Sequence, residues 1–284
     1  MPTGTELIET IDRVDVFDDR MAFWWIGQHG FILKLGGKIL YLDPFLSDSP
    51  QRTVRPLLEA PQIRHADIII GSHDHGDHID RKVWPELARA SAAATFVAPA
   101  LICRGGLGQD LQIDEPRLHP MDDGDTFQAG QVQITALPSA HEQLERDPKT
   151  GLHPYLGFII ESGPWRIYHP GDTTRYEGLE TRLQQFGRID LAFLPINGRD
   201  AQRLADGCIG NMVYQEAVDL AGHCGMAVAV PAHYEMFAHN SEDPAKFVSY
   251  ADVKFPELTT LVPDHGQTVV LEKQSGKVMA ARID

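Results

Sequence analysis

The chain has 284 residues, of which 43% are hydrophobic and 23% charged, proportions typical of a globular protein in water. Its formal net charge of −15 argues against binding to nucleic acids or anionic membranes, because those partners are negatively charged as well. No hydrophobic run approaches the length of a membrane span, and the first residues lack the pattern of a signal peptide. Since the three cysteines also suit a reducing compartment, we expect a cytoplasmic protein that forms one domain over residues 1–284.

Hydrophobic periodicity predicts a short helix over residues 5–13, with Thr5 as its N-cap. Three strands follow, and the second and third meet at the tight turn Gly36-Gly37. Later runs predict strands that alternate with helices. The strands are expected at 21–26, 30–35, 38–42, 66–70, 95–98, 131–137, 155–161, 165–169, 191–194, 227–230, 258–262, 267–272 and 277–281. The later helices are expected at 81–92, 175–186, 212–222 and 243–251.

The chain thus falls into two halves, in which strands come first and strands mixed with helices follow. This order predicts an α/β protein in which two β-sheets pack face to face and helices cover the outer faces. No repeat, low-complexity segment or change of composition suggests a second domain.

The segment 71–80, with the sequence GSHDHGDHID, carries the strongest chemical signal in the chain. His73, His75, Asp77 and His78 lie within six residues, directly after a predicted buried strand. Imidazole and carboxylate are ligands for zinc, manganese and iron, and such a density of them has no evident structural use. Gly76 is expected to allow the sharp turn that brings these side chains together. The segment therefore predicts a metal site, with room for two ions.

Three further ligand candidates follow predicted strands later in the chain. His141 comes after the strand at 131–137, Asp172 stands in a glycine turn after 165–169, and His233 follows 227–230. Each of them alone is a weak signal, because a loop histidine is usually solvated or hydrogen-bonded. Together with the first segment they supply five histidines and two aspartates at strand ends, about the number that a centre with two metal ions needs.

In their order and spacing, these seven residues resemble the metallo-β-lactamase superfamily, and the resemblance spans nearly the whole chain. It implies an αββα sandwich of two mixed β-sheets with helices on the outer faces. It also implies that His73, His75 and His141 hold a first metal ion, that Asp77, His78 and His233 hold a second, and that Asp172 bridges the two. Two such ions lower the pKa of a shared water molecule and so provide a nucleophile at neutral pH. Asp77 would in addition act in catalysis, by orienting that water or accepting its proton.

Shorter motifs resemble one branch of this superfamily, the L-ascorbate-6-phosphate lactonase-like proteins. The motifs are WWIGQHGF (24–31), DPFLSD (43–48), PINGR (195–199), GNM (210–212) and HYEMF (233–237). The branch implies hydrolysis of a small, anionic ester, with a sugar-phosphate lactone as the first candidate. The ligand set contains no cysteine and suits zinc, manganese or iron, and the resemblance to lactonases favours manganese.

Three residues are candidates for contacts with the substrate. Asn197 and Arg199 follow the strand at 191–194, and an arginine there could hold a phosphate or carboxylate through paired hydrogen bonds. Tyr234, next to His233, is a candidate donor to a developing oxyanion. The alternatives are an arginine paired with a nearby acid and a tyrosine that only packs. Gln28 and His29 are further candidates for the pocket wall, whereas His169 is expected to be structural.

Other functions use the same ligands. A phosphodiesterase or other phosphoester hydrolase is the main alternative, and a non-hydrolytic redox or sensor protein with iron is the second. The redox versions of the fold resemble a pattern with Glu where this chain has Gly76, together with an attached flavin domain. A nuclease is disfavoured by the acidic charge. We expect a small-molecule substrate and neither nucleic acid nor membrane as partner, and the sequence leaves open whether the chain forms a homo-oligomer.

Overall fold

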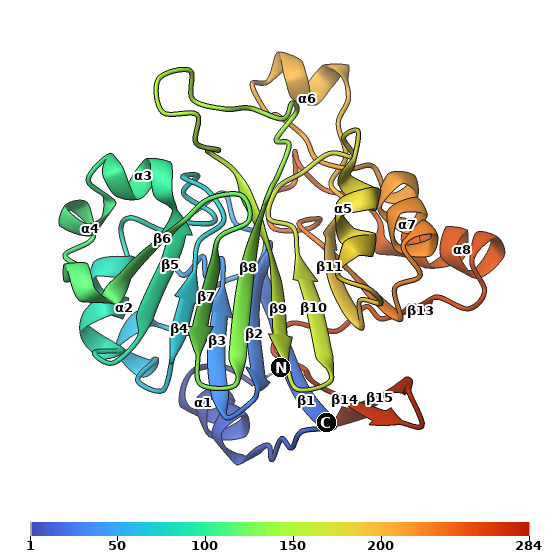
Figure 1. Ribbon diagram of the computed structural model, residues 1–284, viewed down its shortest axis with the longest axis horizontal. Helices are drawn as coiled ribbons and strands as arrows, with labels where there is room; N and C mark the ends of the chain where they lie inside the picture. Colours follow the sequence, from blue (N-terminus) through green and yellow to red (C-terminus); the bar gives the residue numbers. More distant parts are fainter. Residues whose placement is uncertain (1, 284) are drawn as a thin grey trace.

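The computed structural model describes residues 2–283, with side chains up to residue 280, and contains two mixed β-sheets that pack face to face (Figure 1). The first sheet has the strand order β15-β14-β1-β2-β3-β4-β5-β6 within this range. Its strands are β1 (Arg20–Gly27), β2 (Gly30–Leu35), β3 (Lys38–Leu42), β4 (Ile68–Ile70), β5 (Thr95–Pro99), β6 (Leu118–Met121), β14 (Thr268–Gln274) and β15 (Lys277–Ile283). Pairing is antiparallel from β15 to β3 and parallel from β3 to β6.

The second sheet has the order β13-β12-β11-β10-β9-β8-β7 among the described residues. Pairing is antiparallel from β7 to β10 and parallel from β10 to β13. Its strands are β7 (Thr126–Ala129), β8 (Val132–Pro138), β9 (Leu156–Ser162), β10 (Trp165–His169), β11 (Leu191–Pro195), β12 (Val228–Ala232) and β13 (Thr259–Thr260). Each sheet thus has a parallel half, and parallel strands direct their carboxyl ends to the same edge.

Local chemistry explains the central strands. The three isoleucines of β4 are all buried, as expected for a strand that is covered on both faces. Gly36 and Gly37 have φ angles of 56° and 71°, and such paired positive angles make the two-residue turn between β2 and β3. Phe31 of β2 stacks on Phe193 of β11 with ring centroids 3.8 Å apart, and this contact joins the two sheets below the loops.

Helices cover both outer faces (Figure 1). The side chains of α1 and α2 pack on the first sheet, where Trp84 contacts Phe96, while those of α5, α7 and α8 pack on the second. Lys254 of α8 forms an ion pair of 2.6 Å with Asp219 of α7. The helices are α1 (Gly4–Arg13), α2 (Trp84–Ala90), α3 (Ala100–Arg104), α4 (Leu107–Asp110), α5 (Leu179–Gln185), α6 (Ala201–Ala205), α7 (Tyr214–His223), α8 (Pro244–Lys254), η1 (Ala60–Gln62) and η2 (Glu115–Arg117).

The predicted sandwich with outer helices is confirmed, and the errors concern element ends and short elements. Thr5 is not the N-cap of α1, because Thr3 holds that position. The helix expected from 175 begins only at Leu179, after Gly178 with a φ of 90°. The strand expected at 258–262 pairs with β12 only through Thr259 and Thr260. The strands β6 and β7 and the short helices α3, α4 and α6 were not predicted.

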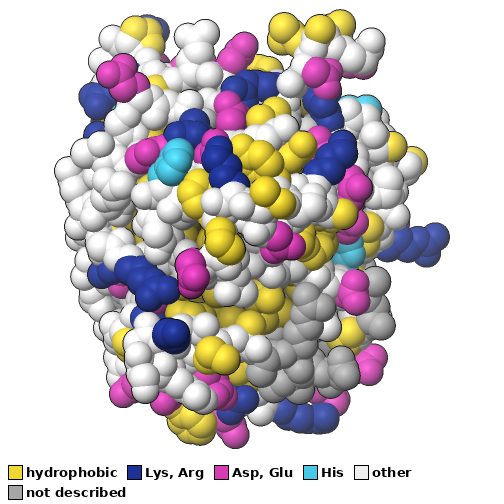
Figure 2. All heavy atoms as spheres, turned by 90° about the vertical axis from the view of Figure 1, so that its right-hand side faces the viewer, with side chains coloured by type: hydrophobic (Ala, Val, Ile, Leu, Met, Phe, Trp, Pro, Cys, Tyr) yellow, Lys and Arg dark blue, Asp and Glu magenta, His cyan; other side chains and the backbone are white. Residues whose placement is uncertain are grey.

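No helix among the described residues is long and apolar enough to cross a membrane. Figure 2 shows the face on the side of α8, where acidic and basic side chains are interspersed with small groups of hydrophobic ones. No stripe of one charge sign is visible on the described atoms of this face.

Candidate metal centre

The seven predicted ligands come together at one edge of the sandwich. His73, His141, Asp172 and His233 each lie within three residues of a strand end, after β4, β8, β10 and β12. Asp77 and His78 complete the segment that begins with His73, where main-chain bonds from His78 and Ile79 to the carbonyl of His75 form a tight turn. The topology therefore gathers residues that are up to 160 positions apart in the chain, from His73 to His233.

His73, His75 and His141 form one group whose potential ligand atoms all lie within 4.8 Å of one another. Nε2 of His73 is 2.9 Å from Nδ1 of His75, and the His141 ring centroid is 5.0 Å from that of His75. His73 is fully buried, whereas His75 is exposed and lines the cavity described below. Three imidazoles with one open side form a donor set that suits a divalent transition metal.

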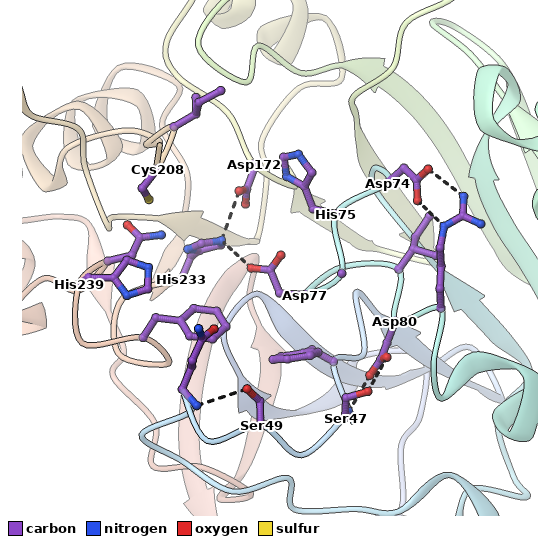
Figure 3. Close-up of a pocket in the computed structure, with 18 of the residues that line it drawn as sticks. Ser47, Ser49, Asp74, His75, Asp77, Asp80, Asp172, Cys208, His233 and His239 are labelled. Carbon is purple, nitrogen blue, oxygen red and sulfur yellow. Dashed lines mark hydrogen bonds and ion pairs between the residues drawn. The ribbon is translucent and has the colours of Figure 1, made fainter. Parts of the chain in front are cut away.

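Asp77, His78 and His233 form a second group by the same criterion. Oδ2 of Asp77 is 3.8 Å from Nε2 of His78 and 3.6 Å from Nε2 of His233. Figure 3 shows the His233 ring between Asp77 and Asp172, with contacts to both carboxylates. Two imidazoles and a carboxylate also fit a divalent ion.

Asp172 lies between the two groups. Its Oδ1 is 3.2 Å from Nε2 of His78, and its Oδ2 is 3.2 Å from Nε2 of His233 and 3.5 Å from Nε2 of His141. Asp172 also groups with His73 and His78 as a potential ligand set. One buried carboxylate thus faces rings from both groups, as a bridging ligand must.

The charges of the cluster follow from burial and from these contacts. Burial opposes ionisation of Asp172, but His233 and His78 hold the pKa of its carboxyl well below the usual value. Burial lowers the pKa of His78, but Asp172, Asp43 and Asp77 together raise it well above the usual value. Burial lowers the pKa of His141 to about 4, although Asp172 acts in the opposite direction. His141 is therefore a neutral ligand at pH 7.

Asp43, at the end of β3, supports the ligands from behind. It is fully buried, and its Oδ2 accepts hydrogen bonds from Nδ1 of His78 at 2.8 Å and from Nε2 of His169 at 2.9 Å. The backbone N–H and hydroxyl of Ser72 donate to the two oxygens of Asp43, both at 2.7 Å. His169 is thus a structural residue, as predicted, while the supporting role of Asp43 was not predicted.

A cavity of about 790 Å³ opens over these groups. The ligand candidates that line it are His75, Asp77, His141, Asp172 and His233. Its outer wall includes Phe45, Asp48, Arg81, Lys82, Asp206, Ile209, Phe237 and His239. The predicted ligands therefore face a space large enough for a small molecule.

The three predicted substrate contacts lie outside the described lining of this cavity. Arg199 forms a two-point ion pair with Glu216, at 2.7 and 2.8 Å, and also donates to the carbonyl of Asn211. Asn197 is fully buried and donates to Asn240. Tyr234 packs on Trp25 with centroids 5.0 Å apart. In this structure Arg199 is paired with an acid and Tyr234 packs on a neighbouring ring, as the alternative interpretations expected. Direct contact of the three residues with substrate stays a prediction.

Other residues also differ from the expectations. Gly76 does not have a positive φ, and a Cβ atom at this position would meet nothing within 4 Å, so the turn does not need glycine there. His29 is buried behind the ligands, with its Nδ1 4.0 Å from Oδ1 of Asp172, and does not line the cavity. His239 lines the cavity although no pattern around it suggested a role.

A model of the beta-lactamase superfamily domain matches residues 39–234, which include every one of the seven ligand candidates. The chain belongs to the beta-lactamase superfamily. Its described fold, two mixed sheets between helices, is the one found in solved proteins of similar structure.

Curated relatives of this superfamily member cover nearly its whole length. A UPF0173 metal-dependent hydrolase of Archaeoglobus fulgidus is 27% identical over 256 residues, which are 89% of this chain and 100% of the relative. Another from Bacillus cereus strain B4264 is 28% identical over 253 residues, with 87% and 99% covered.

Two solved structures show the same fold at low identity. A metallo hydrolase from the archaeon Ignicoccus hospitalis has a TM-score of 0.68 and 20% identity, and the match covers 90% of this chain and 100% of the other. An isothiocyanate hydrolase from Delia radicum gut bacteria also has a TM-score of 0.68, with 16% identity and coverages of 87% and 97%.

Proposed function

We propose that this superfamily member is a metal-dependent hydrolase that binds two divalent ions and cleaves a small ester. His73, His75 and His141 would hold one ion, Asp77, His78 and His233 the other, and Asp172 would contact both. The position of Asp172, within 3.5 Å of rings from both groups, is the observation that carries the proposal. The names of the curated relatives, which are metal-dependent hydrolases, support the same reaction class.

When bound, two such ions would lower the pKa of a shared water molecule and polarise the ester carbonyl. The side chains of the chain would provide the rest. Asp77 is half-buried at the cavity surface, where its carboxylate can orient the attacking water or accept its proton. His141 is neutral above about pH 4 and so keeps a free electron pair for a metal.

For the substrate, we propose a lactone, with a sugar-phosphate lactone as the first candidate. The support comes from the sequence motifs that resemble the L-ascorbate-6-phosphate lactonase-like branch. Zinc or manganese suits the donor set, and iron is a third choice. A phosphate group would need a cationic partner, and the described cavity wall contains two, Arg81 and Lys82. Arg81 is already paired with Asp74 and Asp110, whereas no ion pair of Lys82 occurs among the described residues, so we assign the phosphate contact to Lys82.

The test is a hydrolysis screen with metal-free protein to which Mn²⁺ or Zn²⁺ is returned. The panel contains a phosphorylated sugar lactone, the uncharged lactone of the same ring, a phosphodiester and a phosphomonoester. The proposal predicts metal-dependent opening of the lactones, with none in the presence of a chelator. Hydrolysis of the phosphodiester without any lactone opening would instead establish the phosphoester alternative, since the same nucleophile serves both reactions.

A further inference from the structure

Gln28 lies in the two-residue connection between β1 and β2, directly behind the second ligand group. Its side chain is 1% exposed, and its φ of 55° is an angle that non-glycine residues seldom adopt. The main-chain carbonyl of Gln28 accepts from the backbone N–H of His233 at 2.9 Å and from Nε1 of Trp25 at 3.1 Å. These two hydrogen bonds therefore fix where the Gln28 side chain begins.

The amide of Gln28 reaches two of the three members of the second group. Nε2 donates to Oδ2 of Asp77 at 2.7 Å and lies 3.1 Å from Nε2 of His233. A side-chain amide nitrogen carries two hydrogens, so one group can contact both ligands at once. No hydrogen bond joins the Gln28 side chain to His73, His75 or His141 in the described residues.

The two buried histidines of the second group, His78 and His233, differ in what holds their Nδ1 atoms. Nδ1 of His78 is held by Asp43 at 2.8 Å, the usual arrangement in which an outer carboxylate orients a ligand ring. Nδ1 of His233 is buried without a hydrogen-bond partner. Asp77 likewise has no side-chain hydrogen bond among the described residues except the one from Gln28. Gln28 supports both residues in another way, since its side chain binds Asp77 and its main-chain carbonyl binds the backbone N–H of His233.

We propose that Gln28 is a positioning residue for the second metal ion. Gln28 holds Asp77 and His233 in the arrangement that this ion requires. The proposal rests on the two-metal function given above. Binding of the ion to Nε2 of His233 would displace the Gln28 contact there, while the hydrogen bond to Asp77 persists and keeps one oxygen of that carboxylate fixed. Gln28 therefore orients Asp77 both before and after the ion binds.

The experiment compares stepwise metal binding in wild type and Gln28→Met. Methionine has a similar length but no N–H donor, so both contacts are lost with little change in volume. Metal-free protein is titrated with Mn²⁺ and, separately, with Co²⁺, whose absorbance reports each binding step. The expected result is a dissociation constant for the second equivalent that rises about ten- to a hundredfold, the usual cost of losing an orienting partner. The constant for the first equivalent should stay at the wild-type value.

Two further variants serve as controls for the effect of Gln28→Met. Gln112→Met changes an exposed glutamine with the same φ of 55° and should leave both constants unchanged. Gln28→Asn keeps an amide and suits a positive φ, but is one methylene too short to reach Asp77, so it should weaken the second step as well. Equal weakening of both steps in Gln28→Met would show a general structural role and overturn the proposal, as would unchanged binding. A wild-type protein that takes up no second ion would instead overturn the proposed two-metal function itself.

Discussion

Oδ2 of Asp43 lies 2.8 Å from Nδ1 of His78, and both side chains are fully buried. Because Asp43 also accepts from His169 and Ser72, its position is set by three residues from two segments of the chain. Binding Nδ1 leaves Nε2 of His78 directed at Asp172 and the other ligands. The ligand ring is thus oriented before any ion arrives, a property that raises metal affinity.

Asp43→Asn should lower metal affinity about ten- to a hundredfold, because an amide cannot hold the ring of His78 and stabilise its N–H as a carboxylate does. Competition with a chromophoric chelator measures the affinity. Asp122→Asn is the matched control, since Asp122 binds Nδ1 of His153 at 2.9 Å in a similar pair outside the cluster. If both variants bind metal like the wild type, the Asp43 pair serves only the fold.

Asp77→Asn should lower kcat strongly while it changes the thermal unfolding temperature only slightly. Loss of a group that orients the nucleophile or accepts its proton reduces rates by roughly 10²- to 10⁴-fold, and Asp77 belongs to a loop that the core does not need. Steady-state kinetics with the lactone and thermal unfolding provide the two measurements. Asp74→Asn, in the same loop but paired with Arg81, should retain activity. Near-full activity of Asp77→Asn with normal metal content would remove Asp77 from the catalytic role.

The stability of the metal-free protein should depend on His141 in a defined pH range. The pKa of His141 is lowered to about 4, mainly by burial, against an unfolded value near 6.5. Its contribution is therefore fully present above about pH 6.5 and is lost as the pH falls towards 4, because only the unfolded chain binds the proton. The shift corresponds to about 3 kcal/mol at 1.36 kcal/mol per pKa unit.

Urea unfolding of metal-free wild type and His141→Asn at pH 4.5 and 7 checks this pH dependence. The loss of stability between the two pH values should be smaller in the variant. His73 acts in the same direction, since its pKa is also lowered, whereas the raised pKa values of His78 and His233 act in the opposite direction. These residues are common to both proteins, so the difference reports the titration of His141 together with its coupling to Asp172 and the neighbouring histidines. Equal pH dependence in the two proteins would mean that His141 titrates normally.

Arg199 and Lys82 should differ in their effect on charged substrates. Because Arg199 is paired with Glu216, Arg199→Ala should affect the phosphorylated and the uncharged lactone equally, and should cost at most about 1 kcal/mol of stability for this part-exposed pair. Lys82→Met should lower kcat/KM about tenfold for the phosphorylated lactone alone. A selective loss in Arg199→Ala would restore the substrate contact predicted from the sequence and remove the one assigned to Lys82.

Much of the fold and the clustering of the seven ligand candidates could be predicted because their signals are local. Runs such as Ile68–Ile70 mark buried strands, and histidines after strand ends mark the edge where parallel strands meet. The contacts that support these candidates have no local signal. Asp43 and Gln28 lie in motifs noted in the sequence, but their partners lie 35 and 205 positions away, at His78 and His233. Only the folded topology brings these pairs together.

Arg199 shows a limit of the sequence in another way. Its place after β11 correctly suggested a residue near the edge of the sheet, but Glu216 in the first turn of α7 binds the guanidinium. The sequence shows that an acid is available seventeen positions later and not which way the arginine turns. The edge strands β6 and β7 were missed because each has only four residues, too few for a hydrophobic pattern to stand out in the sequence.

The number of metal ions per chain decides whether the two ligand groups form one centre for two ions. Metal-free protein is loaded with Mn²⁺ or Zn²⁺, freed of excess ion, and analysed for metal content and lactone hydrolysis in the same sample. The account predicts two equivalents in the wild type, activity that requires the second, and fewer equivalents in Asp172→Ala, because that carboxylate faces both ligand groups. A wild-type protein that saturates at one equivalent, or an Asp172→Ala protein that still holds two, would contradict it.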